Sequence, residues 1–88
     1  MTKISKFLYK VLRGTSDTDI SFDELCGLLT ALGFSERTRG SHHIFSHTGI
    51  EEIINLQAKG SKAKPYQVKQ VRQLIVKYRL VDGYDDSL

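Results

Sequence analysis

The sequence has few of the residues that build covalent or metal-bound frameworks. It contains one cysteine, Cys26, one proline and no tryptophan. No disulfide can therefore form within the chain, and no cysteine pair is available for zinc. A single cysteine suits the reducing cytoplasm, and we expect its side chain to be a small, buried apolar group.

Long apolar runs are also missing. No segment approaches the roughly 20 apolar residues that a membrane-spanning helix needs. The first seven residues have neither the apolar core nor the cleavage site of a secretory signal peptide. We therefore expect a cytoplasmic protein with no membrane partner.

Acidic residues are absent from one long part of the chain. Between residues 59 and 79 there is no Asp or Glu, although the whole chain has 10 of them and a formal net charge of +3. One-sided clustering of this kind is typical of nucleic-acid binding, and a solvated helix face is the alternative. The basic residues of this segment are Lys59, Lys62, Lys64, Lys69, Arg72, Lys77 and Arg79.

What is present indicates a single small domain, residues 1–88, of ordinary globular composition, with 40% hydrophobic and 26% charged residues. Apolar residues at helical spacing predict a helix over residues 3–12. A second helix is predicted after Ser21, which has capping-box spacing from Glu24, and Gly33 is expected to end it. A last helix is predicted from Pro65 to about residue 78, because a first helical turn tolerates proline.

Short runs rich in β-branched and aromatic residues predict strands between the second and last helices. The expected strands are residues 34–38, 42–47 and 53–56, with turns at 39–41 and 48–49. Residues 58–64 are expected to be a flexible basic loop. The predicted fold class is α+β, with a three-stranded antiparallel sheet, the flanking helices on one face in two layers, and an extra N-terminal helix.

The second predicted strand carries all three histidines of the chain. Side chains alternate along a strand, so His43 and His47 share one face and His42 and Ile44 share the other. Taking Ile44 as the residue that faces the helices, we expect His43 on the open face of the sheet.

Three interpretations of these histidines stay open on the residues alone. Adjacent histidines in a strand point in opposite directions and no cysteine is expected near them, so we expect no metal site. Histidines bonded to backbone or solvent are the second interpretation. The third is RNA cleavage: a base takes the 2′-hydroxyl proton, an acid protonates the leaving 5′-oxygen, and cations stabilise the phosphate charge. That reaction needs no cofactor and leaves a 2′,3′-cyclic phosphate.

The basic loop before the last helix is a candidate phosphate clamp. Lys62 and Lys64 precede the free N–H groups of a first helical turn, which favour anions. Lys59 and Lys69 flank them and complete the predicted set of RNA-phosphate-binding residues. A mobile, solvated linker is the alternative.

Three motifs, taken in order, resemble the HicA toxin family. They are Gly-Ser-His-His-Ile-Phe at residues 40–45, Glu-Ile-Ile-Asn-Leu-Gln at 52–57 and Lys-Ala-Lys-Pro-Tyr-Gln-Val at 62–68. The resemblance spans residues 20–78. It implies a fold like the double-stranded-RNA-binding domain, a metal-independent endoribonuclease that cleaves mRNA and blocks translation, and a HicB-type antitoxin that covers the active site.

The same resemblance assigns roles to the first motif. The second residue after Gly-Ser, His43, corresponds to the catalytic histidine. Gly40 and Ser41 would position it, and His42 would support it. The extra helix and loop (1–19) and a frayed acidic tail (81–88) flank a family-like core (20–80), and they leave the oligomeric state open.

Three functional hypotheses follow. The first is a ribonuclease toxin with His43 as general acid or base, its second proton-transfer group being His42, His47, a lysine or water. The second is a non-catalytic RNA-binding module, which predicts salt-sensitive binding without cleavage. The third is a protein-binding element whose basic face serves an acidic partner.

Overall fold

The computed structural model describes residues 3–83. Its elements follow the predicted order of two helices, three strands and a helix, with two further short strands before the last helix. They are α1 (Lys3–Arg13), α2 (Phe22–Ala31), β1 (Ser35–Arg39), β2 (His42–His47), β3 (Ile50–Leu56), β4 (Ala58–Lys59), β5 (Lys62–Ala63), α3 (Pro65–Lys77) and the 3₁₀ helix η1 (Leu80–Gly83).

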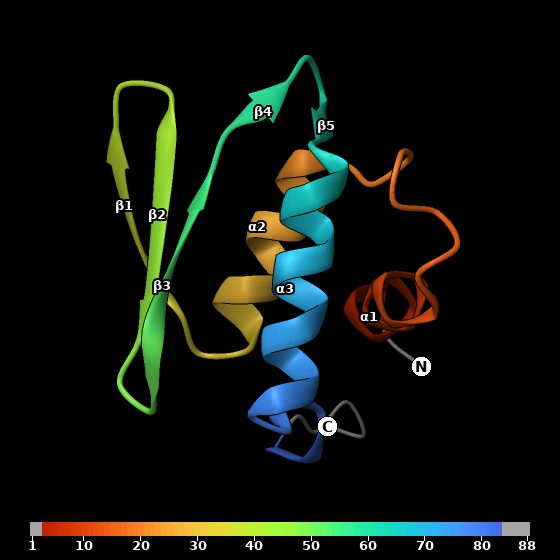
Figure 1. Cartoon of the computed structure of the whole chain (residues 1–88), viewed down its shortest axis with the longest axis vertical. Coiled ribbons are helices and arrows are strands. Elements are labelled where there is room, and N and C mark those ends of the chain that lie inside the picture. Colours follow the sequence, from red (N-terminus) through yellow and green to blue (C-terminus); the bar gives the residue numbers. More distant parts are fainter. Residues whose placement is uncertain (1–2, 84–88) are drawn as a thin grey trace.

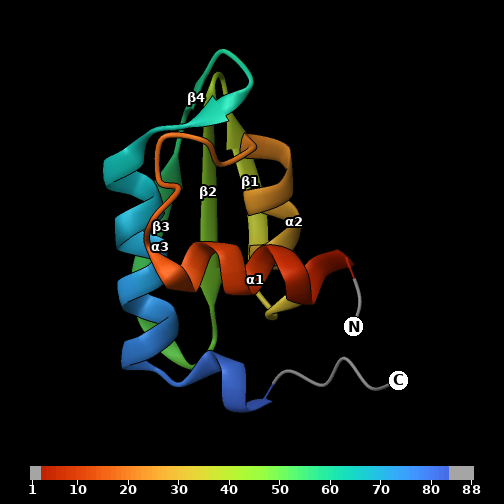
Figure 2. The ribbon, with the colours of Figure 1, turned by 90° about the vertical axis from the view of Figure 1, so that its right-hand side faces the viewer.

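The molecule is built in layers. The strands β1, β2 and β3 form an antiparallel sheet with β2 in the centre. Helices α2 and α3 cover one face of this sheet, and α1 crosses them on their other side (Figure 1; Figure 2). The two predicted layers are therefore confirmed for the core, and the extra N-terminal helix adds a third.

Local signals place the ends of the helices where the sequence predicts them. The Ser21 side chain accepts a hydrogen bond from the Glu24 backbone N–H at 3.3 Å and so caps α2. Gly33 follows the end of α2 with a backbone φ of 100°, a conformation that residues other than glycine rarely adopt. Pro65 is the first residue of α3.

The predicted assignment of the sheet faces is wrong. Phe45 is fully buried and pairs with Ile54, which is also fully buried, whereas Ile44 is half-buried and pairs with the exposed Asn55. The face that carries His43 and Phe45 therefore packs on the helices. The physical reason is that the aromatic ring removes more apolar area from water than the isoleucine does.

The prediction of a flexible basic loop at 58–64 is also wrong, because this segment contains the β4–β5 hairpin. Its turn contains Gly60 at φ of 63°. The Phe22 N–H donates to the Ser61 carbonyl at 3.0 Å, and the Ala63 N–H donates to the Ile20 carbonyl at 2.9 Å. These bonds fasten the hairpin to the start of α2 and bury Ala63.

Other strand limits differ by small amounts. β1 begins and ends one residue later than predicted, and β3 begins at Ile50 rather than at Ile53. The first three residues of the predicted frayed tail, 81–83, belong to η1, and Val81 packs against the core. The remaining residues of that prediction, 84–88, lie outside the described part of the chain. No helix among residues 3–83 is long and apolar enough to cross a membrane.

Candidate functional site

His43 is the second residue of β2, next to the turn that joins β1 to β2, and lies on the covered face of the sheet. Its Nδ1 donates to Glu36 Oε2 at 2.6 Å, and the two side chains are 30% and 33% exposed. The edge of its ring contacts Phe22, with the ring centroids 5.0 Å apart and the planes at 73°. The imidazole is thus oriented by a carboxylate and a phenyl ring while it stays accessible to solvent.

Glu36 was not among the predicted site residues. The two-residue turn at Gly40 and Ser41 pairs Thr38 with His43, and Glu36 lies two residues further along β1 on the same face. A carboxylate two residues before the cross-strand partner of His43, and so on the same face, is a sequence signal that could have identified it.

Cys26 projects from α2 toward the same pair. One donor atom from each of Cys26, Glu36 and His43 lies within 4.8 Å of the other two. Burial, followed by the negative charge of Glu36, raises the pKa of the Cys26 thiol to about 12. The expectation that no cysteine lies near the histidines is therefore wrong, and the half-buried side chain is less covered than predicted.

His42 points to the opposite face. Its Nδ1 donates to Asn55 Oδ1 at 3.1 Å. The ring lines a hollow of about 260 Å³ that also contains Gln57 and Tyr66. Two adjacent residues of one strand therefore belong to two different environments.

A second hollow, of about 600 Å³, adjoins this one and shares Gln57 and Tyr66 with it. It contains Lys59 and Lys64. We call the two hollows together the polar groove. The Gln57 side chain connects its parts, because its amide Nε2 donates to Ser41 Oγ at 3.1 Å and its Oε1 accepts from Lys64 Nζ at 3.4 Å.

The structure divides the four predicted phosphate-binding lysines. Lys59 and Lys64 line the polar groove. Lys62 instead donates to Asp19 Oδ1 at 2.6 Å, and this bond lowers the pKa of Asp19. Lys69 is exposed on α3. The pKa of Asp17 is lowered mainly by its hydrogen bond with Arg72, and the charge of Lys69 adds to this effect.

Much of the basic segment is paired with acids from elsewhere in the chain. Arg72 donates to both carboxylate oxygens of Asp17, at 2.8 and 3.0 Å, and to the Val11 carbonyl at 3.2 Å. These bonds hold the pKa of Asp17 below its usual range. Lys77 pairs with Glu52 at 2.7 Å. The run of cations is therefore not one continuous binding surface.

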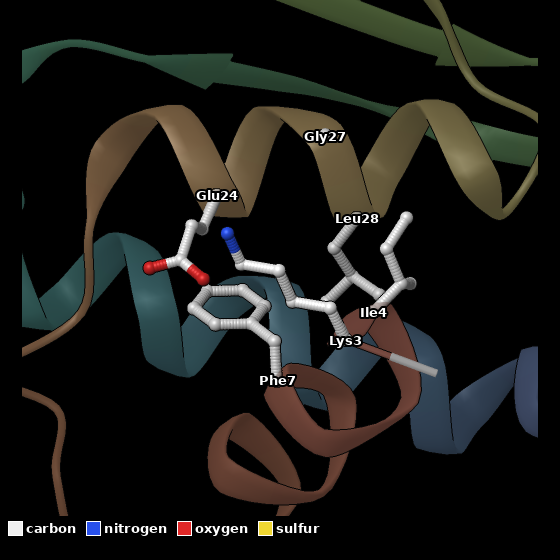
Figure 3. Close-up of a pocket in the computed structure, with 6 residues that line it drawn as sticks. All are labelled: Lys3, Ile4, Phe7, Glu24, Gly27 and Leu28. Carbon is white, nitrogen blue, oxygen red and sulfur yellow. The ribbon is translucent and has the colours of Figure 1, made fainter. Parts of the chain in front are cut away.

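A further hollow, of about 100 Å³, lies between α1 and α2. Ile4 and Phe7 of α1 approach Leu28 of α2 there, with Lys3 and Glu24 at its rim (Figure 3). It contains none of the residues predicted to act on RNA, so two candidate sites remain. One is the polar groove, and the other is the group formed by His43, Glu36 and Cys26.

The core from α2 to α3, with three antiparallel strands between two helices on one sheet face, defines a small α+β protein with the fold of the double-stranded-RNA-binding domain. The chain belongs to the HicA toxin family, since the family model described as the HicA toxin of bacterial toxin-antitoxin systems matches residues 22–75. The predicted resemblance is thereby confirmed, and α1 lies outside the match. No curated protein and no solved structure is significantly similar to the chain.

Proposed function

We propose that this protein is a cytoplasmic, metal-independent endoribonuclease that cleaves mRNA and inhibits translation, with His43 as its general acid or base. The observation that carries the proposal is the 2.6 Å contact between His43 Nδ1 and Glu36. A carboxylate on one ring nitrogen fixes the tautomer and leaves Nε2 to exchange protons with a substrate. Membership of a toxin family supports this reading.

The reaction uses the ribose of the RNA itself. A base takes the proton of the 2′-hydroxyl, whose oxygen attacks the adjacent phosphorus, and the 5′-oxygen leaves with a proton from the acid. The products are a 2′,3′-cyclic phosphate and a free 5′-hydroxyl. Positive groups that contact the phosphate stabilise its transient extra charge.

The first motif supplies the turn that presents both histidines. Gly40 has φ of 58° in this turn, and Ser41 is held by Gln57. His42 lines the polar groove beside Gln57, and the Gln57 side chain accepts a hydrogen bond from Lys64. We propose that backbone flanking the cleaved phosphate lies in this groove, with His42 in a supporting role, and that the cleaved phosphate itself lies at His43.

The deciding experiment is cleavage of a long single-stranded RNA in EDTA by wild type, His43→Ala, His42→Ala and His47→Ala. Loss of a general acid or base lowers the rate by about 10²- to 10⁴-fold, and we expect this for His43→Ala. His47→Ala is the matched control, because His47 lies at the other end of β2, where its Nδ1 accepts from the Gly49 N–H. Circular dichroism establishes that each variant is folded.

Two results would contradict this assignment. Cleavage by His43→Ala at the wild-type rate removes His43 from the chemistry. Loss of cleavage in His42→Ala alone transfers the proton-transfer role to the polar groove. Fragments that end in 2′,3′-cyclic phosphate, and resistance of an RNA with 2′-deoxyribose at the cut site, identify the mechanism.

A second candidate, a non-catalytic RNA-binding module, is favoured by one observation. His43 is on the face of β2 that the helices cover, whereas the neighbouring His42, which lines the polar groove, is on the open face. Such a module would bind RNA without cutting it. For this function we expect Lys59→Gln or Lys64→Gln to lower the steepness of log affinity against log salt concentration by about 1. Lys62→Gln is the matched control, since Lys62 pairs with Asp19.

We also propose a HicB-type antitoxin as the protein partner, because the chain belongs to a toxin-antitoxin family. Co-expression with the product of an adjacent gene, followed by co-purification, tests this partner. We expect the complex to suppress cleavage by wild type. A complex that forms and leaves cleavage unchanged would contradict an inhibitory partner.

A further inference from the structure

Three different metal-ligating side chains meet beside Phe22 on the covered face of the sheet. Cys26 comes from α2, Glu36 from β1 and His43 from β2. One sulfur, one oxygen and one nitrogen atom from them all lie within 4.8 Å of one another. From this cluster we propose a binding site for a zinc-like divalent transition-metal ion, which would block the proton transfer assigned to His43.

The chemistry of the three donors fits zinc. Thiolate, imidazole and carboxylate are the three kinds of side chain that bind Zn²⁺ in proteins. The Cys26 thiol becomes a thiolate by releasing its proton to solvent as the ion binds. A sulfur donor selects transition metals over Mg²⁺ and Ca²⁺, which take oxygen ligands. Three protein ligands leave a fourth tetrahedral position for water or another small ligand, and the partial exposure of Glu36 and His43 leaves that side open.

The distances fit after small side-chain rotations. Metal–donor bonds of about 2.0–2.3 Å in a tetrahedron place the donors about 3.3–3.8 Å apart. The His43 and Glu36 atoms, now 2.6 Å apart around a shared proton, must separate by about 0.7 Å. The widest donor separation, at most 4.8 Å, must shrink by about 1 Å.

The scaffold holds the donors on regular elements rather than on loops. Cross-strand pairing sets β1 against β2, with Glu36 opposite Phe45 and Thr38 opposite His43. The Ser21 cap fixes the first turn of α2, one turn before Cys26. Donors on helices and strands are preorganised, so little conformational entropy is lost when an ion binds.

The consequence for activity rests on the function proposed above. A neutral imidazole carries one N–H, so an ion on Nδ1 displaces the proton that now bonds to Glu36, and the single N–H moves to Nε2. That nitrogen then has no lone pair with which to accept a proton from RNA as a base, and no imidazolium forms that could donate one as an acid. The ion also takes the Glu36 carboxylate from the histidine. Metal binding should therefore inhibit the ribonuclease.

Titration of the full chain with Co²⁺, in a non-thiol reductant, tests the site directly. Cys26 is the only cysteine, so a thiolate-to-cobalt charge-transfer band can come from no other residue. We expect this band together with tetrahedral d–d bands at one ion per chain, and Zn²⁺ should abolish both. Cys26→Ser should lose the charge-transfer band, and Glu36→Gln should keep it with at least tenfold weaker binding.

His42→Gln is the matched control for His43→Gln, because the two histidines are adjacent and face opposite sides. We expect His43→Gln to weaken Co²⁺ binding at least tenfold and His42→Gln to leave it unchanged. Three results would overturn the site: no charge-transfer band, saturation at half an ion per chain with two chains sharing it, or equal weakening by both histidine variants.

A cleavage assay separates the metal proposal from the proposed function. Each protein is compared with its own rate in EDTA, and added Zn²⁺ should slow wild type at least tenfold more than Cys26→Ser. Equal inhibition of the two proteins would overturn the regulatory role. Absence of cleavage in EDTA overturns the ribonuclease proposal, while the cobalt titration still decides the metal site on its own.

Discussion

The two faces of the central sheet place neighbouring histidines in opposite surroundings. His43 shares the covered face with Phe45 and contacts Glu36 and Phe22. His42 shares the open face with Asn55 and lines the polar groove. The difference shows that adjacent positions of a strand cannot be assigned to one site, because successive side chains are separated by the thickness of the sheet.

The largest expected effect compares Phe45→Ala with Ile44→Ala. Phe45 is fully buried, so its truncation leaves a cavity and should lower the free energy of unfolding by about 3–5 kcal/mol. Ile44 is half-buried on the other face, and its truncation should cost less than about 2 kcal/mol. Urea denaturation measures both, and equal losses would contradict the assignment of the faces.

The next comparison uses two glycines with positive φ, Gly33 and Gly40. A left-handed conformation costs a side-chain-bearing residue about 1–2 kcal/mol, which we expect for Gly40→Ala, where nothing lies within 4 Å of the added carbon. At Gly33 that carbon would lie 3.1 Å from the Nε2 atom of His47. Displacing this ring should add about 0.5–1.5 kcal/mol.

Thermal unfolding measures the two glycine variants side by side. The expected order is a lower melting temperature for Gly33→Ala than for Gly40→Ala. Equal melting temperatures would show that His47 moves without cost, and the contact of its ring with Phe34 would then contribute nothing to stability.

The next prediction is a smaller effect of pH on the free energy of unfolding. It compares Glu52, on the covered face, with Glu51, on the open face. Hydrogen bonds from Lys77 and then from Tyr78 lower the pKa of Glu52 to about 2. A lowered folded-state pKa stabilises the protein above the unfolded-state pKa of about 4.3, and this stabilisation is lost as the pH falls toward about 2. Glu52→Gln should therefore be less stable than wild type at neutral pH, and the difference should shrink in acid.

Chemical denaturation at a series of pH values tests this prediction. Glu51→Gln is the matched control, because it removes the same formal charge from the neighbouring residue. A Glu52→Gln curve that stays parallel to wild type from neutral to acid pH would contradict the role of the Lys77 and Tyr78 contacts.

The smallest expected effect is at Ile53, which is 61% exposed on the open face. Ile53→Thr keeps a β-branched side chain in β3 and should change the free energy of unfolding by no more than about 0.5 kcal/mol. Urea denaturation measures it. A loss comparable with that of Phe45→Ala would mean that another part of the chain covers this face.

Much of the fold could be predicted because its signals are local. The Ser21 cap, the positive φ of Gly33 and the first-turn Pro65 each act within a few residues, and each lies where the sequence predicts it. The ends of β2 were predicted for the same reason, since turns at 40–41 and 48–49 bound it. The motif residues were sufficient to predict the family.

The candidate site was predicted only in part. His42 and His43 were identified from the motif, but their faces were exchanged, and Glu36 and Cys26 were missed. Lys59 and Lys64 lie together as expected, whereas Lys62 is paired with Asp19. Apart from Glu36, which lies across a tight turn from His43, each error concerns a contact between residues distant in the chain, on which spacing along one element carries no information.

The sequence by itself determined the order of the helices and of the three main strands, together with the limits of β2, because capping, turn conformation and side-chain periodicity are properties of a few consecutive residues. Only the tertiary structure decided which face of the sheet is covered, that residues 58–63 form a hairpin, and that Cys26 meets Glu36 and His43. These outcomes depend on how Phe45 and the other core side chains bury apolar area against helices far away in the chain.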